Sequence, residues 1–186
     1  MSANKPTPAR TSDALWMDLA LVAFLVALDV VARLLPHAPG LLPVAASALF
    51  AGRVLRIPAL AVIVPLLAMA LSDALLPHES APVTLVVFAA MTIPAFAGML
   101  SRRYNGPVVI GSVMLACSLI FFATTNFAVW AFSGIYSLDL SGLTQCYVAA
   151  LPFLEKSVMG DLFWTGVFFG GAWAIQNGAA LAGRTH

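Results

Sequence analysis

Long apolar runs, separated by short polar clusters, restrict the folds open to this chain. Of its 186 residues, 61% are hydrophobic and only 9% are charged. A water-soluble domain carries about 25% charged residues, so this chain has too few to cover a surface that faces water. Apolar runs of roughly 20 residues are long enough to cross the hydrocarbon core of a bilayer as helices. The sequence therefore predicts an all-α, polytopic membrane protein whose surroundings are the lipid bilayer.

Six of the apolar runs are expected to be transmembrane helices. The second is short, and is expected to be thin, tilted or partly re-entrant, while Pro65 and Pro94 should kink the third and fourth. The more polar residues 127–156 are expected to form an outer lid between the fifth and sixth spans. Within the lid, residues 143–154 show the spacing of a short amphipathic helix. The predicted spans are residues 15–35, 41–54, 57–76, 83–100, 107–127 and 157–181.

The basic residues predict the orientation of these spans. An even number of spans places both tails, residues 1–14 and 182–186, on one side of a single membrane domain over residues 15–181. Of the nine lysines and arginines, only Arg33 and Lys156 fall on the opposite side. Because basic loops remain in the cytoplasm, the sequence predicts a multi-pass protein with cytoplasmic termini.

Several function classes find no support in the sequence. A net charge of +1 without a basic run argues against a nucleic-acid partner. The chain has no P-loop pattern for ATP hydrolysis and no G-x-S-x-G nucleophile motif. His78 and Glu79 are not followed by the second histidine of H-E-x-x-H. We therefore expect neither an enzyme nor a resident cofactor, although paired outer carboxylates such as Glu155 and Asp161 leave a membrane enzyme as a third class.

Ionisable side chains near the outer ends of the spans suggest a binding pocket. Asp29 and Arg33 stand four residues apart, so they can pair along one helix face. Ionisable groups at this depth usually face the protein interior or a wet cavity. They form either the wall of an outward-facing pocket or a structural ion pair. Asp73, at the outer end of the third span, belongs to the same pocket or caps its helix.

The fifth span ends on three consecutive hydrogen-bonding residues, of which Thr125 and Asn126 are the pocket candidates. Their side chains bond either to neighbouring helices or to a ligand. Trp130 and Tyr136 are either interfacial belt residues or stacking walls. The candidate substrate-binding residues are Asp29, Arg33, Asp73, Thr125, Asn126, Trp130, Tyr136 and Asp161.

A weaker pattern concerns metals. His37 and His78 lie on two outer loops that could converge, and a pair of neutral imidazoles can ligate a transition metal. Cys146, near the outer surface, is either structural or a thiolate ligand to the same metal. These three residues are the candidate metal ligands.

Small residues recur at every fourth position of the last span. Such stripes allow two helices to approach closely in a membrane. The second helix belongs either to this chain or to a partner membrane subunit. The stripe consists of Gly166, Gly170, Ala174 and Gly178.

Four blocks of sequence carry a resemblance to a known family. They are RLLPHAPGLLPVAASALFAG from residue 33, PLLAMALSDALL from residue 65, TTNFAVWAFSGIYSLDLSGLTQCYVAALPF from residue 124, and GDLFWTGVFFGG from residue 160. Over residues 15–175 the chain resembles a family of small bacterial membrane proteins. That family is similar to the substrate-binding S-components of energy-coupling factor (ECF) transporters.

The resemblance implies a protein of the bacterial inner membrane that binds a vitamin or a metal ion from the outer side. One solitary S-component of similar size is a cobalamin transporter, in which a cysteine ligates the cobalt. Here the third loop offers His78, Glu79 and Ser80 in place of that cysteine, and the outer cysteine is Cys146, so cobalamin is one candidate ligand among others. The leading hypothesis is an S-component-like transporter that moves a small molecule inward. Its alternative is an accessory structural subunit of a larger membrane complex.

Overall fold

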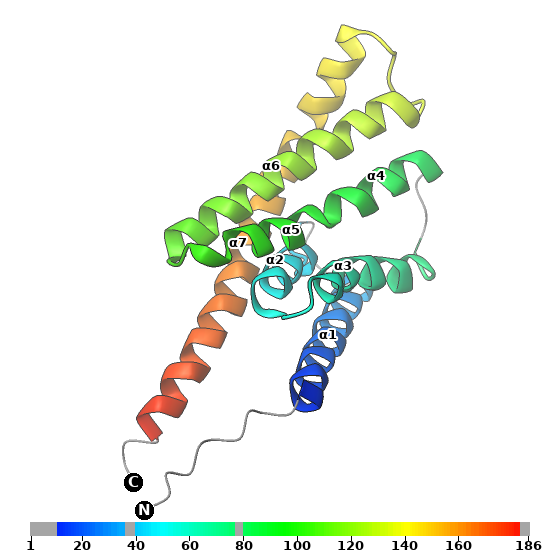
Figure 1. Ribbon diagram of the computed structural model, residues 1–186. Coiled ribbons are helices and arrows are strands. Elements are labelled where there is room, and N and C mark those ends of the chain that lie inside the picture. Colours follow the sequence, from blue (N-terminus) through cyan, green and yellow to red (C-terminus); the bar gives the residue numbers. More distant parts are fainter. Residues whose placement is uncertain (1–10, 36–39, 77–79, 183–186) are drawn as a thin grey trace, which may run out of the picture.

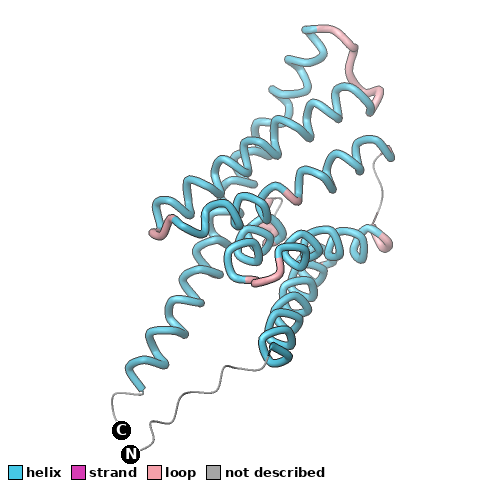
Figure 2. Tube along the Cα trace, in the orientation of Figure 1, coloured by secondary structure: helices cyan, strands magenta, loops and turns pink. Residues whose placement is uncertain are grey.

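The computed structural model describes residues 11–35, 40–76 and 80–182, and all of their regular secondary structure is helical (Figures 1 and 2). The predicted all-α class is therefore confirmed for these residues. The helices are α1 (Thr11–Leu34), α2 (Val44–Val54), α3 (Pro58–Asp73), α4 (Ala81–Met91), α5 (Ile93–Leu100), the short 3-10 helix η1 (Ser101–Arg103), α6 (Pro107–Phe132) and α7 (Leu140–Ala182).

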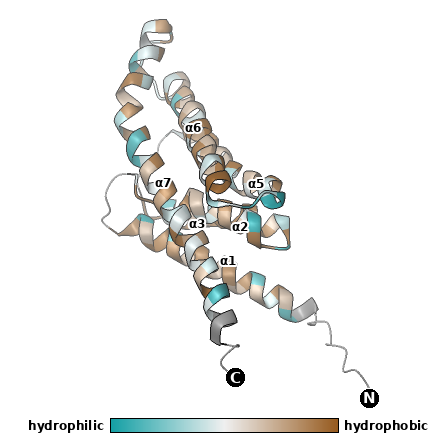
Figure 3. Ribbon diagram, turned by 90° about the vertical axis from the view of Figure 1, so that its left-hand side faces the viewer, coloured by the Kyte–Doolittle hydropathy of each residue, from teal (hydrophilic) through white to brown (hydrophobic). Residues whose placement is uncertain are grey.

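The length and hydropathy of these helices identify a helical membrane protein. Helices α2 and α3 are also apolar, but each is shorter than a full crossing of the bilayer. Large apolar side chains such as Leu85, Leu100 and Val108 are exposed, as expected of a surface that contacts lipid. Hydrophobic residues predominate along most of the helices in Figure 3. Within the described residues, the stretches long and apolar enough to cross a membrane are 13–34, 81–103, 107–132 and 140–178.

Proline sets several of the helix boundaries. Pro58 and Pro107 stand at the first position of α3 and α6, where the missing N–H costs no hydrogen bond. Near Pro94, where a kink was predicted, the fourth predicted span divides into two helices, because α4 ends at Met91 and α5 begins at Ile93. Pro65 lies inside α3, which continues through it.

Helix α2 forms the centre of the core. Most of its residues are buried, and it packs against α3, α5 and α7. Its crossing with α5 brings the two backbones into contact at Gly52 and Gly98. A Cβ atom built on Gly52 would overlap the carbonyl oxygen of Ala95, and one on Gly98 would lie 3.0 Å from the Cα of Gly52. The crossing therefore requires glycine at both positions.

Two arginines connect the C-terminal ends of α2 and α5 by hydrogen bonds. The Nη1 of Arg53 donates to the carbonyl oxygen of Ser101 at 2.5 Å. In return, Arg102 donates to the carbonyl oxygens of Gly52 and Leu55 at 2.8 and 2.6 Å. Carbonyls at the ends of helices lack partners within the helix, so each arginine satisfies groups that the other helix leaves open.

The predicted outer lid is not a separate loop. Of residues 127–156, only 133–139 are non-helical, because α6 extends to Phe132 and α7 begins at Leu140. The expected short amphipathic helix and the last span form one helix that passes through Pro152. Polar side chains can point outward from a helix, so a drop in hydropathy did not require the helix to stop. The resulting α6–α7 hairpin forms one end of the molecule in Figure 1.

The turn of this hairpin is closed by its own side chains. Asp139 Oδ1 accepts hydrogen bonds from the backbone N–H of Gly142 at 2.7 Å and from the Ser137 hydroxyl at 2.9 Å. These bonds, led by that of Gly142, lower the pKa of Asp139 below its ordinary value. Trp130 Nε1 donates to the Ser137 carbonyl at 2.9 Å, which ties α6 to the turn. Trp130 is therefore used in closing the hairpin.

Candidate functional site

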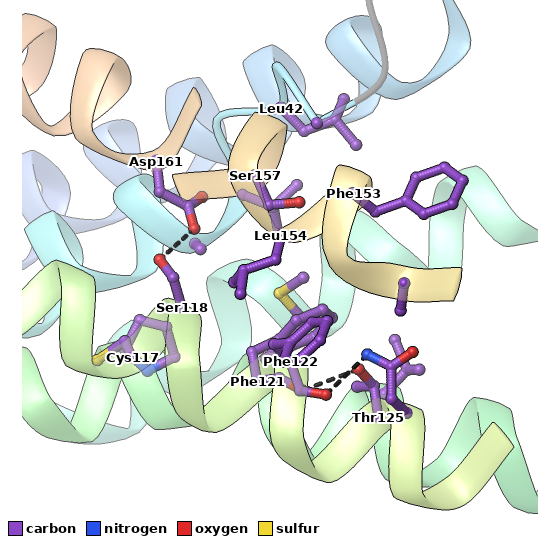
Figure 4. A pocket seen from close by; sticks show the side chains of 18 of the residues that line it. Leu42, Cys117, Ser118, Phe121, Phe122, Thr125, Phe153, Leu154, Ser157 and Asp161 are labelled. Carbon is purple, nitrogen blue, oxygen red and sulfur yellow. Dashed lines mark hydrogen bonds between the residues drawn. The ribbon is translucent and has the colours of Figure 1, made fainter. Parts of the chain in front are cut away.

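A cavity of about 380 Å³ lies between α4, α6 and α7 and the start of α2 (Figure 4). Its wall is mainly apolar, with the rings of Phe121, Phe122 and Phe153 and the thioethers of Met69 and Met91. Mostly apolar cavities of this size with a few placed polar groups are the usual form of small-molecule sites. The polar and charged side chains of its wall are those of Arg33, Ser118, Thr125, Asn126, Ser157 and Asp161.

Asp161 of α7 faces Ser118 of α6 across the cavity wall (Figure 4). The Ser118 Oγ lies 2.6 Å from the Asp161 Oδ2, and it also lies 3.1 Å from the carbonyl oxygen of Met114, one turn earlier in α6. Among the described residues, Asp161 has no ion pair. The carboxyl group therefore depends on one hydroxyl for its hydrogen bonding.

Arg33 lines the same cavity but pairs with α3. Its Nη2 forms an ion pair with Asp73, and its Nε donates to the Ser72 hydroxyl at 2.6 Å. The expected pairing of Arg33 with Asp29 is therefore wrong. Two neighbouring acceptors on α3, Ser72 and Asp73, match two nitrogens of the planar guanidinium, whereas Asp29 Oδ2 is hydrogen-bonded to Ser47 of α2.

Asp29 is fully buried in the core, where it faces α2. The Ser47 Oγ lies 2.5 Å from its Oδ2, and its Oδ1 has no hydrogen-bond partner in the described structure. Asp29 is not part of the cavity wall. It therefore joins α1 to α2 rather than contacting a ligand in this cavity.

The structure brings together half of the predicted substrate-binding residues. Arg33, Thr125, Asn126 and Asp161 line the cavity, whereas Asp29, Asp73, Trp130 and Tyr136 do not. The Thr125 hydroxyl and the Asn126 amide nitrogen each donate to a carbonyl of the preceding turn of α6, at 2.8 Å.

Of the three predicted metal ligands, Cys146 lies within the described residues. His37 and His78 lie outside the described residues, so their predicted convergence stays a prediction. Cys146 is buried and its Sγ lies 3.4 Å from the carbonyl oxygen of Asn126, which makes it a contact between α7 and α6. Within residues 11–35, 40–76 and 80–182, no three metal-binding side chains come together.

Sequence reasoning missed Ser118 and the phenylalanine rings of the cavity. Ser118, Phe121, Phe122 and Thr125 share one face of α6 at helical spacing. The helical spacing of Phe122, Phe121 and Ser118 before Thr125 was therefore the signal that could have identified them. It was hidden because the opposite face of α6 is equally apolar.

The small-residue stripe of α7 does not pack against this chain. Gly166, Gly170, Ala174 and Gly178 are all exposed. A Cβ atom built on any of the three glycines would meet no other atom within 4 Å. Of the two uses considered for the stripe, packing within the chain is therefore not observed.

Comparison with known proteins assigns the chain to a family without assigning it an activity. No curated protein and no solved structure matches it. One family model, described as a family of unknown function (DUF6580), matches residues 14–182. That range includes every residue of the cavity wall and nearly all of the helical structure. The chain, an all-helical membrane protein with a mainly apolar cavity, therefore belongs to the DUF6580 family.

Proposed function

We propose that this protein is an S-component-like transport protein of the bacterial inner membrane. It binds a small molecule from the outer side in the cavity between α4, α6 and α7 and moves it inward. The supporting observation is the cavity itself, which combines an apolar wall with a few polar groups from helices far apart in sequence. The resemblance of the sequence to S-components supports the same function.

The proposal includes six passes with cytoplasmic termini, formed by α1, α2, α3, the α4–α5 pair, α6 and α7. Arg53 and Arg102 lie together at one end of the bundle, and this end corresponds to the cytoplasm in the proposal. The ion pair of Arg33 with Asp73 lies at the ends of α1 and α3 that this topology places outside.

Cysteine labelling from outside intact cells tests this topology. Ser80→Cys and Ser137→Cys should react with an impermeant maleimide, because the proposal places both residues outside. Asn105→Cys should react only after the cells are opened. The parent protein, labelled in the same way, is the control for any reaction of the native Cys117 and Cys146, which are buried. Labelling of Asn105→Cys in intact cells would refute the proposed topology.

Asn126→Ala tests the binding function. Asn126 lines the cavity, and its amide nitrogen already donates to the Phe122 carbonyl. Loss of one ligand hydrogen bond is worth about 1 kcal/mol, so affinity for the retained ligand should fall about fivefold. Native mass spectrometry of protein purified from its host should show a ligand of fixed mass whose occupancy falls in the variant. The melting temperature should remain close to that of the parent.

Thr124→Ala is the matched control, because Thr124 is exposed, lies outside this cavity and makes the same kind of bond to its own helix. It should leave occupancy unchanged. Equal occupancy in a well-folded Asn126→Ala protein would contradict the binding function.

A second function, that of an accessory subunit in a membrane complex, is favoured by the open stripe of α7. The exposed face at Gly166, Gly170 and Gly178 leaves room for the backbone of another helix. In this case the protein purified from its host would carry a partner of fixed stoichiometry and no retained small molecule. The same native mass spectrum therefore separates the two functions.

A further inference from the structure

We propose that the cavity binds a small organic cation with an apolar body, and that this cation displaces one proton from Asp161. The inference rests on the proposed binding function and names the chemical class of its ligand. It stands on the charge balance of the cavity wall, on the hydrogen bonds of Ser118 and on the aromatic rings that face the cavity.

The first argument is the charge balance. Of the described residues that line the cavity, only Arg33 and Asp161 carry a formal charge. The charge of Arg33 is neutralised by Asp73, and its Nε is occupied by Ser72. Asp161 has no cationic partner among the described residues. An ionised Asp161 would therefore leave the wall with one uncompensated negative charge, which a bound cation would balance.

The elements around Asp161 offer few other groups that titrate. Helix α6 contributes the thiol of Cys117, beside Ser118, and α1 contributes Arg33. The parts of α2, α3, α4 and α5 that line the cavity contribute no titratable side chain. On α7 itself, Glu155 and Lys156 are exposed and do not line the cavity. The cavity-lining residues from α2 to α5 are Val44, Ala45, Met69, Val87, Met91 and Pro94.

The second argument is the count of protons at Ser118. Its hydroxyl has one proton, but its Oγ lies within hydrogen-bond distance of two acceptors, Asp161 at 2.6 Å and the Met114 carbonyl at 3.1 Å. A protonated Asp161 resolves this arrangement, because it donates to Ser118 while Ser118 donates to Met114. A neutral carboxyl group also avoids the cost of an unpaired charge in an apolar wall. Without a bound cation, Asp161 is therefore the neutral acid.

Binding of a cation would reverse this arrangement with a complete balance of protons and charge. The O–H bond of Asp161 breaks, and the proton leaves to water. The resulting carboxylate pairs with the bound cation, and the Ser118 hydroxyl rotates from Met114 to donate to Asp161. The occupied site is neutral, as was the empty one, and one proton has been exchanged for one cation.

The third argument concerns the body of the ligand. The rings of Phe121, Phe122 and Phe153 line the same cavity as Asp161 (Figure 4). Aromatic faces attract organic cations as well as apolar groups. A volume of about 380 Å³ accommodates an aromatic amine but is far larger than a bare inorganic ion requires. The wall therefore selects a cation attached to an apolar body.

Three indole compounds of similar size test the proposal on the purified full-length protein in detergent. Tryptamine is the cation, tryptophol is neutral, and indole-3-propionate is the anion. Isothermal titration should show tryptamine binding about tenfold more tightly than either of the others, as expected of a charge-assisted hydrogen bond. Its affinity should rise with pH, by at most tenfold per pH unit, for as long as the free protein holds the proton. Titration in two buffers of different ionisation enthalpy should report one proton released per tryptamine.

Variants identify the group that responds. Asp161→Asn keeps the hydrogen bond to Ser118 but removes the charge, so the preference for tryptamine and its pH dependence should disappear. Asp161→Glu should retain both. Glu155→Gln, which removes an exposed acid of the same helix, should behave as the parent. The comparison of the three compounds on the unaltered protein decides the cation preference even if a variant fails to fold.

Three results would overturn the inference. They are equal affinity for the three compounds, a tryptamine preference that survives in Asp161→Asn, and tryptamine binding without proton release. If the neutral or anionic compound binds best and Asn126→Ala weakens it, the ligand class is wrong while the binding function stands. If Asn126→Ala leaves every ligand's occupancy unchanged, the binding function itself fails.

Discussion

Gly52→Ala should lower the free energy of unfolding by about 3 kcal/mol, the upper part of the usual range for overpacking a core. The added methyl group would overlap the Ala95 carbonyl oxygen, which belongs to the backbone of α5 and cannot rotate away. Gly98→Ala should have a similar effect, because its methyl group would overlap the Leu49 carbonyl oxygen. Thermal and chemical unfolding in detergent micelles measure both changes.

Gly166→Ala and Gly170→Ala are the matched controls. Their methyl groups enter open space, so these variants should be as stable as the parent or slightly more stable, since alanine favours a helix over glycine by about 1 kcal/mol. Opposite signs for the two pairs are the expected outcome. If Gly52→Ala were as stable as Gly166→Ala, the close approach of α2 and α5 would be wrong.

Arg33→Gln should destabilise the protein by about 3 kcal/mol, because it leaves the charge of Asp73 unpaired in a mostly buried position. The side chains of Arg33 and Asp73 are only 16% and 20% exposed. Arg33→Met combined with Asp73→Leu should be milder than the sum of the single changes, since it removes both charges together. Chemical unfolding of the parent, of Arg33→Met, of Asp73→Leu and of the double variant gives the coupling energy, which should be about 2 kcal/mol.

The same cycle on Asp29 and Arg33 is the control, because Arg33 bonds to α3 and Asp29 bonds to Ser47 on α2. Its coupling should be clearly smaller than that of the Arg33–Asp73 cycle. A larger coupling for Asp29 would show that Arg33 turns toward its own helix instead of toward α3.

Most helix positions followed from the sequence because most of the apolar runs have the length of a crossing and proline marks several of their ends. Pro107 begins α6 as expected, and the site of the kink expected near Pro94 is the break between α4 and α5. The partner of Arg33 could not be derived in this way. Helical spacing places Asp29 within reach, but only the packing of α1 on α3 brings Ser72 and Asp73 to the guanidinium.

The hairpin and the cavity show two further limits. The polar residues after Phe127 resembled a loop, yet they continue as helix on both sides of the 133–139 turn, because hydropathy reports burial and not backbone conformation. Arg33, Thr125, Asn126 and Asp161 were identified because polar groups stand out in apolar runs. Ser118 and its aromatic neighbours did not stand out, since every face of α6 is apolar.

The length of α7 has a mechanical consequence. At 1.5 Å per residue, its 43 residues extend for about 64 Å, twice the hydrocarbon thickness of about 30 Å. Its first turns are tied to α6 by the bonds of Cys146 and Tyr147, while the segment beyond Pro152 carries both Asp161 and the open glycine face. Proline is where a helix bends most readily. A pull on residues 166–178 would therefore be resisted first by the contacts of Phe168 and Phe169 with Phe50 of α2, while the hydrogen bond between Asp161 and Ser118 lies further back along the helix.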